Sequence, residues 1–131
     1  MYSSLIKKAK KARDNAYAPY SNFTVGAALL TKNQKVFLGC NIENASFSPT
    51  NCAERTAFFK AISEGEREFE AIAVVGGKRE ESVLCPPCGV CRQVMLEFCK
   101  PDFKIILEDK NEIKIFTLSE MLPLNFNKDF I

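Results

Sequence analysis

The sequence predicts an α/β fold of three layers, in which a mixed sheet of about five strands is flanked by helices. Two observations support this fold class. Apolar residues recur at helical spacing in some segments and form short, β-branched runs in others. Along the chain these segments follow the order helix, two strands, helix, strand, helix, two strands, which suits a sheet covered by helices. The length of 131 residues suits a single domain over residues 1–131.

In the first half of the chain, turn residues separate the helical and strand-like segments. Helical spacing of apolar residues marks the first helix, and Ser3 or Ser4 is its expected N-cap. Pro19 cannot continue a helix, so we expect a turn there. The polar stretch "KNQK" lies between two strand-like runs and predicts an antiparallel hairpin. The expected elements are a helix over residues 3–15, a turn over 17–22, strands over 23–31 and 36–42, and a helix over 52–65.

The second half begins with "FEAIAVVGG", a nearly continuous apolar run that is typical of a strand buried on both faces. A charged loop follows, and then a short helix that Lys100 and Pro101 bring to an end. Two further strands surround a "KNE" turn. The expected elements are a strand over residues 69–77, a loop over 78–84, a helix over 88–99, strands over 103–109 and 113–118, and a helical turn with an extended tail over 118–126.

Charge and hydrophobic patterning argue against two classes of partner. The net charge is only +2, both signs are interspersed, and the basic run Lys7–Arg13 fits the solvated face of a helix better than a nucleic-acid footprint. No apolar segment approaches the length of a membrane span, and the N-terminal residues lack the apolar run of a signal peptide. We therefore expect a cytoplasmic protein that binds neither nucleic acid nor membranes.

The chain contains six cysteines and no histidine. In a reducing compartment, cysteines serve metal binding or catalysis more often than disulfide frameworks. Without histidine, proton transfer near neutral pH requires a carboxylate, a cysteine, a lysine or a metal-bound water.

The stretch "CPPCGVC" offers two overlapping C-x-x-C pairs. Cys88 and Cys91 lie three residues apart at the start of a predicted helix and therefore share a face. Cys85 precedes Pro86, which favours extended backbone and carries it away from that helix. The pair Cys88–Cys91 is therefore the better ligand candidate, although it also fits a redox pair or half of a structural zinc site.

Cys52 opens another predicted helix, so it can meet Cys88 and Cys91 if the two helix N-termini face each other. Three thiolates would leave the fourth position of a zinc ion open, as in catalytic sites. Glu54, two residues after Cys52, could then move a proton to and from a zinc-bound water. Cys40 in a strand is expected to be a small buried apolar residue, and Cys99, at the far end of the helix over residues 88–99, is expected not to reach the other thiols.

These residues resemble those of a known family. "CAE" followed by "PCGVCRQ" resembles the zinc signature of nucleoside and nucleobase deaminases. The stretches "APYSNFTVGAALL", "GCNIENASF" and "NCAERTAFFKAISEG" extend the resemblance to the small homotetrameric zinc-dependent cytidine deaminases, from Ala9 to about Phe126. The resemblance implies a five-stranded sheet between helices, one Zn²⁺ per chain, a pyrimidine nucleoside as substrate and a homotetramer with shared active sites.

The resemblance also implies roles for individual residues. Cys52, Cys88 and Cys91 would bind zinc, and Glu54 would be the catalytic proton shuttle. The implied substrate contacts are Phe23 beside the pyrimidine or sugar, Asn41 and Glu43 at the ribose 3′-hydroxyl, the backbone of Ala53 at the pyrimidine, and Ala45, Phe47 and Phe126 in sites shared with neighbouring subunits. Arg55 and Arg92 would interact with the thiolates and moderate their charge.

The implied reaction converts cytidine and deoxycytidine to uridine and deoxyuridine plus ammonia, through attack of zinc-bound hydroxide at C4. Two departures from the family pattern stand out: Pro86 where relatives often carry Ser, and Phe47 where they often carry Tyr. The alternatives are a deaminase of another aminopyrimidine nucleoside such as a blasticidin-type antibiotic, a structural zinc or redox module, and a deaminase acting on nucleic acid.

Overall fold

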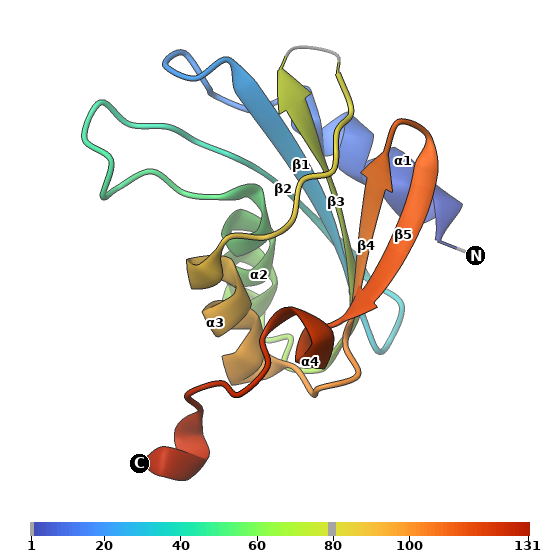
Figure 1. Ribbon diagram of the computed structural model, residues 1–131, viewed down its shortest axis with the longest axis vertical. Coiled ribbons are helices and arrows are strands. Elements are labelled where there is room, and N and C mark those ends of the chain that lie inside the picture. Colours follow the sequence, from blue (N-terminus) through green and yellow to red (C-terminus); the bar gives the residue numbers. More distant parts are fainter. Residues whose placement is uncertain (1, 79–80) are drawn as a thin grey trace.

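Five strands form a mixed sheet in the computed structural model, which describes residues 2–78 and 81–131 (Figure 1). The strand order across the sheet is β2-β1-β3-β4-β5. β3 and β4 pair in parallel, and the other neighbours are antiparallel. The strands are β1 (Phe23–Thr31), β2 (Val36–Cys40), β3 (Phe69–Lys78), β4 (Lys104–Asp109) and β5 (Glu112–Thr117). The predicted mixed five-stranded sheet is confirmed.

Helices cover both faces of the sheet, so the predicted three layers are confirmed (Figure 1). α1 (Ser3–Arg13) packs on one face, where Leu5 and Ile6 meet Ala28 and Ile106. α2 (Ala53–Ser63) and α3 (Gly89–Phe98) cover the other face and bury the larger core around Phe58. The short helix α4 (Leu118–Met121) and the 3-10 helix η1 (Lys128–Phe130) follow β5.

Two glycines let the helices lie unusually close to the sheet. A Cβ added to Gly39 on β2 would lie 2.3 Å from the carbonyl oxygen of Ala53, at the start of α2. A Cβ added to Gly26 on β1 would lie 2.0 Å from the carbonyl oxygen of Ala9 in α1. The absence of a side chain at Gly39 therefore fixes how closely the first turn of α2 approaches β2.

Some predicted boundaries differ from the structure. The N-cap of α1 is Tyr2, without a side-chain hydrogen bond, so the predicted cap at Ser3 or Ser4 is wrong. β2 ends at Cys40 because Ile42 leaves the strand and forms bridges with Tyr17 and Asn51.

The predicted loop over residues 78–84 contains residues 79 and 80, which lie outside the described residues, and Val83 in it forms a bridge with Gly76. Within residues 2–78 and 81–131, no helix is long and apolar enough to cross a membrane.

Candidate metal and proton-transfer site

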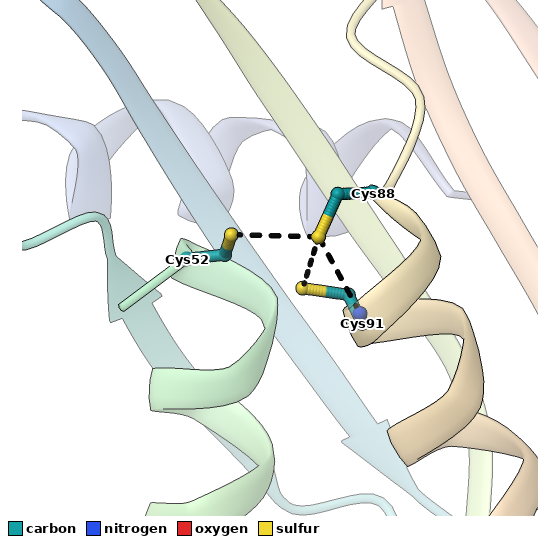
Figure 2. Close-up of side chains that lie close together, drawn as sticks. All are labelled: Cys52, Cys88 and Cys91. Atoms are coloured by element: carbon teal, nitrogen blue, oxygen red, sulfur yellow. Dashed lines mark hydrogen bonds between the residues drawn. The ribbon is translucent and has the colours of Figure 1, made fainter. Parts of the chain in front are cut away.

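Three cysteine side chains meet where α2 and α3 begin (Figure 2). The sulfur of Cys88 lies 3.7 Å from that of Cys52 and 3.5 Å from that of Cys91. All three sulfurs lie within 4.8 Å of one another. The two helix N-termini therefore face each other, and the structure brings together the three thiols that the sequence nominated.

Local backbone structure explains this convergence. Cys52 and Cys88 are the N-cap residues of their helices, with extended backbones, and Cys91 lies in the first turn of α3. The sulfur of Cys88 accepts a hydrogen bond from the backbone N–H of Cys91 at 3.5 Å. The positive end of each helix dipole points toward the sulfurs and favours their thiolate forms.

The pKa values of Cys52 and Cys91 are shifted in opposite directions. Contact with Cys91 lowers the pKa of Cys52, and the hydrogen bonds from Arg55 and Cys88 act in the same direction. The same contact with Cys52, together with burial, raises the pKa of Cys91. The contact thus favours the thiolate form at Cys52 and the protonated form at Cys91, and a cation that binds both as thiolates would displace the proton of Cys91.

This donor set suits zinc. Three thiolates at mutual distances of a few ångströms are soft ligands, and in the described part of the chain the cluster holds no fourth protein ligand. The charge of three thiolates and Zn²⁺ sums to about −1, which Arg55 can offset because its Nη2 donates to the sulfur of Cys52 at 3.3 Å. The Nε atom of Arg55 is buried without a hydrogen-bond partner among the described residues.

Glu54 provides a carboxyl group beside the thiols. Glu54 is only 4% exposed to solvent. Burial raises the pKa of Glu54 to about 7, and the charge of Cys52 adds to this effect while Arg55 opposes it. The charge of Glu54 in turn raises the pKa of Cys91 and of Cys85. A carboxyl group poised near neutral pH can both accept and donate a proton.

The remaining cysteines lie outside the thiol cluster, as predicted. Cys85 packs against β3, where its sulfur would lie 3.0 Å from a Cβ added to Gly76, and burial raises its pKa to about 11. Cys40 ends β2, and Cys99 is the C-cap of α3. These three thiols are therefore partly buried side chains that pack in the fold away from the thiol cluster.

Asn41 forms two hydrogen bonds with the backbone of β1. Its Oδ1 accepts from the N–H of Val25 at 2.8 Å, and its Nδ2 donates to the carbonyl oxygen of Phe23 at 2.8 Å. The side chain of Asn41 therefore continues the pairing of β2 with β1 beyond the end of the strand.

Glu43 holds the turn that leads into β1. It accepts hydrogen bonds from the backbone N–H groups of Tyr20 and Ser21, at 2.9 and 3.2 Å, and from the hydroxyl of Ser21. The bond from that hydroxyl lowers the pKa of Glu43, and both backbone bonds act in the same direction. Glu43 also lines a pocket of about 350 Å³ with Tyr20, Ser21 and Phe47. This role of Ser21 could not be predicted from local pattern, because the contact joins residues 22 positions apart.

The other predicted substrate contacts lie partly in the core and partly on the surface. Phe23 begins β1 and packs against the core on the face of α2, and Ala53 is fully buried in the first turn of α2. Ala45, Phe47 and Phe126 lie on the surface, and Phe47 is 89% exposed. The structure therefore leaves these last three residues available to another molecule.

Arg92 differs from the prediction. Its Nε donates to the carbonyl oxygen of Pro87 at 2.7 Å, and its Nη1 donates to that of Met121 at 2.6 Å. Within the described residues, none of its hydrogen bonds reaches a sulfur atom. The guanidinium of Arg92 thus binds two backbone carbonyls and stabilises the turn before Cys88 instead of contacting the thiols.

Known proteins match nearly the whole chain. Residues 1–107 match the family model described as "Cytidine and deoxycytidylate deaminase zinc-binding region". A cytidine deaminase from Halalkalibacterium halodurans is 54% identical over 126 residues, which are 95% of this chain and 93% of the relative. A crystal structure of cytidine deaminase from Burkholderia pseudomallei is 50% identical, with a TM-score of 0.89 over 96% of this chain and 99% of that chain.

A blasticidin-S deaminase from Bacillus cereus is a more distant relative, at 29% identity over 110 residues, 80% of this chain and 78% of the relative. The family model covers well over half of the chain, and the more similar relatives extend over almost all of it. The chain therefore belongs to the family of cytidine and deoxycytidylate deaminases with a zinc-binding region.

Proposed function

We propose that the protein hydrolyses cytidine and deoxycytidine to uridine and deoxyuridine, with release of ammonia. One observation carries the proposal: three thiols from two helix N-termini surround one point, and the buried carboxyl of Glu54 lies beside them with its pKa raised to about 7. The family match and the 54% identity to a cytidine deaminase support the same reaction.

Cys52, Cys88 and Cys91 are the residues that would hold zinc. When bound there, zinc supplies a strong Lewis acid that makes water nucleophilic at neutral pH. The thiols contribute by losing their protons, which the two helix N-termini and Arg55 make easier.

Glu54 moves the protons that hydrolysis requires. It takes a proton from the attacking water and delivers it to N3 of the pyrimidine, and it then helps to protonate the amino group that leaves as ammonia. Water and cytidine are consumed, uridine and ammonia are formed, and Glu54 ends in its starting state. A pKa of about 7 suits both directions of transfer, because neither protonation state is strongly favoured near neutral pH.

Asn41 and Glu43 are the proposed contacts to the ribose 3′-hydroxyl. After its two backbone bonds, Asn41 keeps one amide hydrogen and one lone pair of Oδ1. Glu43 accepts three hydrogen bonds and has a further acceptor position. Together they offer a donor and an acceptor to a hydroxyl, and their backbone contacts hold both groups in place before the substrate arrives.

The remaining proposed contacts come from Phe23 beside the ring, from the backbone of Ala53, and from neighbouring subunits of a homotetramer. The exposure of Ala45 and Phe126 supports this last role, since each is free to enter another subunit's site. Phe47 has no hydroxyl, so it can contribute only apolar contact. The cytoplasmic location and the single domain stay predictions.

A spectrophotometric assay on cytidine, deoxycytidine, free cytosine and blasticidin S tests the proposal. We expect both nucleosides to be deaminated, and cytosine to be at least about 100-fold less efficient, because the polar groups of Asn41 and Glu43 would stay unpaired. Equal efficiency on cytosine would remove the ribose contact. A preference for blasticidin S over cytidine would replace the proposed substrate.

A further inference from the structure

Two neighbouring side chains of α3 both bind the C-terminal part of the chain. Nη1 of Arg92 donates to the carbonyl oxygen of Met121 at 2.6 Å, and Nε2 of Gln93 donates to that of Phe126 at 2.9 Å. Both residues directly follow Cys91. The same Arg92 donates from Nε to Pro87, one residue before Cys88, at 2.7 Å. The helix that begins at Cys88 and contains Cys91 is therefore fastened to the last eleven residues of the chain at two points.

Residues 123–131, called the C-terminal arm below, extend away from the sheet past the end of α3 (Figure 1). The arm has a defined shape of its own. Asn125 donates to the carbonyl oxygen of Leu122 at 2.9 Å, Asn127 donates to Asn125 at 2.8 Å, and the rings of Phe126 and Phe130 stack at 5.5 Å.

The arm packs loosely against its own chain. Phe126 and Phe130 are about two-thirds exposed. A pocket of about 420 Å³ is lined by residues of α3, among them Gln93, and by residues of the arm, among them Phe126. The hydrogen bond from Gln93 joins α3 to the backbone of Phe126, whose side chain is mostly exposed, so this bond holds Phe126 where apolar burial is small.

We propose that Arg92 and Gln93 are positioning residues that fix α4 and the C-terminal arm that follows it relative to the thiol cluster. Gln93 determines where Phe126 is presented, and Arg92 holds Met121 and Pro87 in one orientation through the rigid fork of its guanidinium. A displacement of the arm that also moves Met121, two residues before it, would thus reach the turn before Cys88 through Arg92. The link to substrate binding rests on the proposed function, in which Phe126 completes a neighbouring site.

A pair of variants at position 93 tests the arm half of the proposal. Gln93→Met removes the donor at nearly equal volume, whereas Gln93→Lys keeps a donor of similar reach. We expect chymotrypsin to cleave after Phe126 about fivefold faster in Gln93→Met, as the loss of one neutral hydrogen bond implies, and at the wild-type rate in Gln93→Lys. Cleavage is followed by intact mass, and equal rates in all three proteins would overturn the proposal.

The same pair gives a kinetic test. In Gln93→Met we expect the KM for cytidine to rise about threefold to tenfold with kcat changed less than about twofold, because a binding contact is misplaced while the proton-transfer site is intact. Gln93→Lys should restore KM. Faster cleavage with an unchanged KM would refute the link between arm and substrate site.

Arg92→Lys tests the other half, because one ammonium group cannot bond both carbonyls in the fixed geometry of a guanidinium. Arg67→Lys is the matched control, since Arg67 also donates to two carbonyls, those of Ile62 and Glu66, away from the thiols. We expect zinc release to a chromogenic chelator to be about fivefold faster in Arg92→Lys only. Equal release from both variants would contradict the proposal.

These readouts separate the proposal from the proposed function. Cleavage of the arm and release of zinc require no turnover of cytidine, so they test the positioning roles even if cytidine is not the substrate. If Arg92→Lys fails to fold, the pair at position 93 decides alone.

Discussion

Glu54 is buried near the sulfur of Cys52, whose negative charge disfavours an ionised carboxylate. Its burial therefore costs free energy that an exposed acid would not. Burial raises its pKa to about 7, close to the pKa at which a carboxyl can serve as both acid and base in neutral solution. In a chain without histidine, this carboxyl takes the place that an imidazole often fills.

The raised pKa of Glu54 predicts a pH dependence of stability in the metal-free protein. The folded state binds this proton more tightly than the unfolded state, where the carboxyl has its ordinary pKa of 4.5. The free-energy cost of burying the charged carboxylate is therefore absent below about pH 4.5, grows as the pH rises to about 7 and is complete above that. It amounts to roughly 3 kcal/mol at 1.36 kcal/mol per pKa unit.

Metal-free Glu54→Gln should accordingly be more stable than metal-free wild type at pH 8, by up to about 3 kcal/mol, and nearly equal to it at pH 4.5. Urea unfolding at both values measures the difference. A constant difference between pH 4.5 and 8 would show that Glu54 does not titrate with a raised pKa.

Cys85 and Cys88 provide a matched test of the ligand assignment. Cys85 lies in "CPPC" with Cys88 but outside the thiol cluster. We expect Cys85→Ala to retain about one zinc per chain, and Cys88→Ala to lose most of it, because only the latter removes one of three ligands. Metal analysis of the purified proteins measures both. Loss of zinc from Cys85→Ala would assign Cys85 a ligand role.

At the scale of elements, the position of Cys52 depends on how closely α2 approaches β2. A Cβ at Gly39 would lie 2.3 Å from the backbone of Ala53, 2.6 Å from the backbone of Ala57 and 3.0 Å from its side chain. The neighbouring atoms are mostly backbone, so the helix itself must move to make room. Gly89, at the start of α3, has no atom of the described residues within 4 Å of an added Cβ.

Gly39→Ala should therefore destabilise the protein by about 1–3 kcal/mol, as overpacking does, and weaken zinc binding by displacing Cys52. Gly89→Ala should be neutral or stabilising by up to about 1 kcal/mol, because alanine favours helix. Thermal unfolding and competition with a chelator measure the two effects. Equal effects of the two substitutions would contradict the close approach.

The elements themselves were largely predictable because each has a strong local pattern. The run "FTVGAALLT" predicts both ends of β1 correctly, and the spacing of Cys88 and Cys91 predicts that they share one face. The meeting of Cys52 with them was predictable from two helix starts. The strand over residues 36–42 was predicted too long, because its end depends on bridges with Tyr17 and Asn51.

Contacts between distant segments were not predictable from local pattern. The partner of Arg92 at Met121 lies 29 residues away, and that of Gln93 at Phe126 lies 33 residues away. The raised pKa of Glu54 also depends on burial in the folded chain. For such features the sequence supplied the residue type, and only tertiary packing supplied the partner.

At the scale of the whole molecule, exposed aromatic side chains lie on two projecting segments. Phe47 is 89% exposed between β2 and α2, and Phe126 is 64% exposed on the C-terminal arm. Exposed aromatic residues of this size are typical of contact surfaces. In the proposed homotetramer they would be covered by neighbouring subunits, and each active site would combine residues from more than one chain.

Mixing two impaired variants tests this sharing. Glu54→Gln chains lack the proton shuttle, and Phe126→Ala chains lack the contributed ring. When the two are refolded together, some sites should combine an intact Glu54 with an intact Phe126 from another chain. We expect the mixture to exceed the summed activities of the separate proteins several-fold. Activity that merely equals the sum would contradict shared sites.

The most direct test of the central claim is the turnover of cytidine by wild type and Glu54→Gln at equal zinc content. We expect the wild type to bind one zinc per chain and to release ammonia and lose cytidine absorbance together. Glu54→Gln should bind the same zinc with kcat lower by about 10²–10⁴-fold, as the loss of general acid–base catalysis implies. Near-wild-type turnover by zinc-loaded Glu54→Gln would contradict the claim.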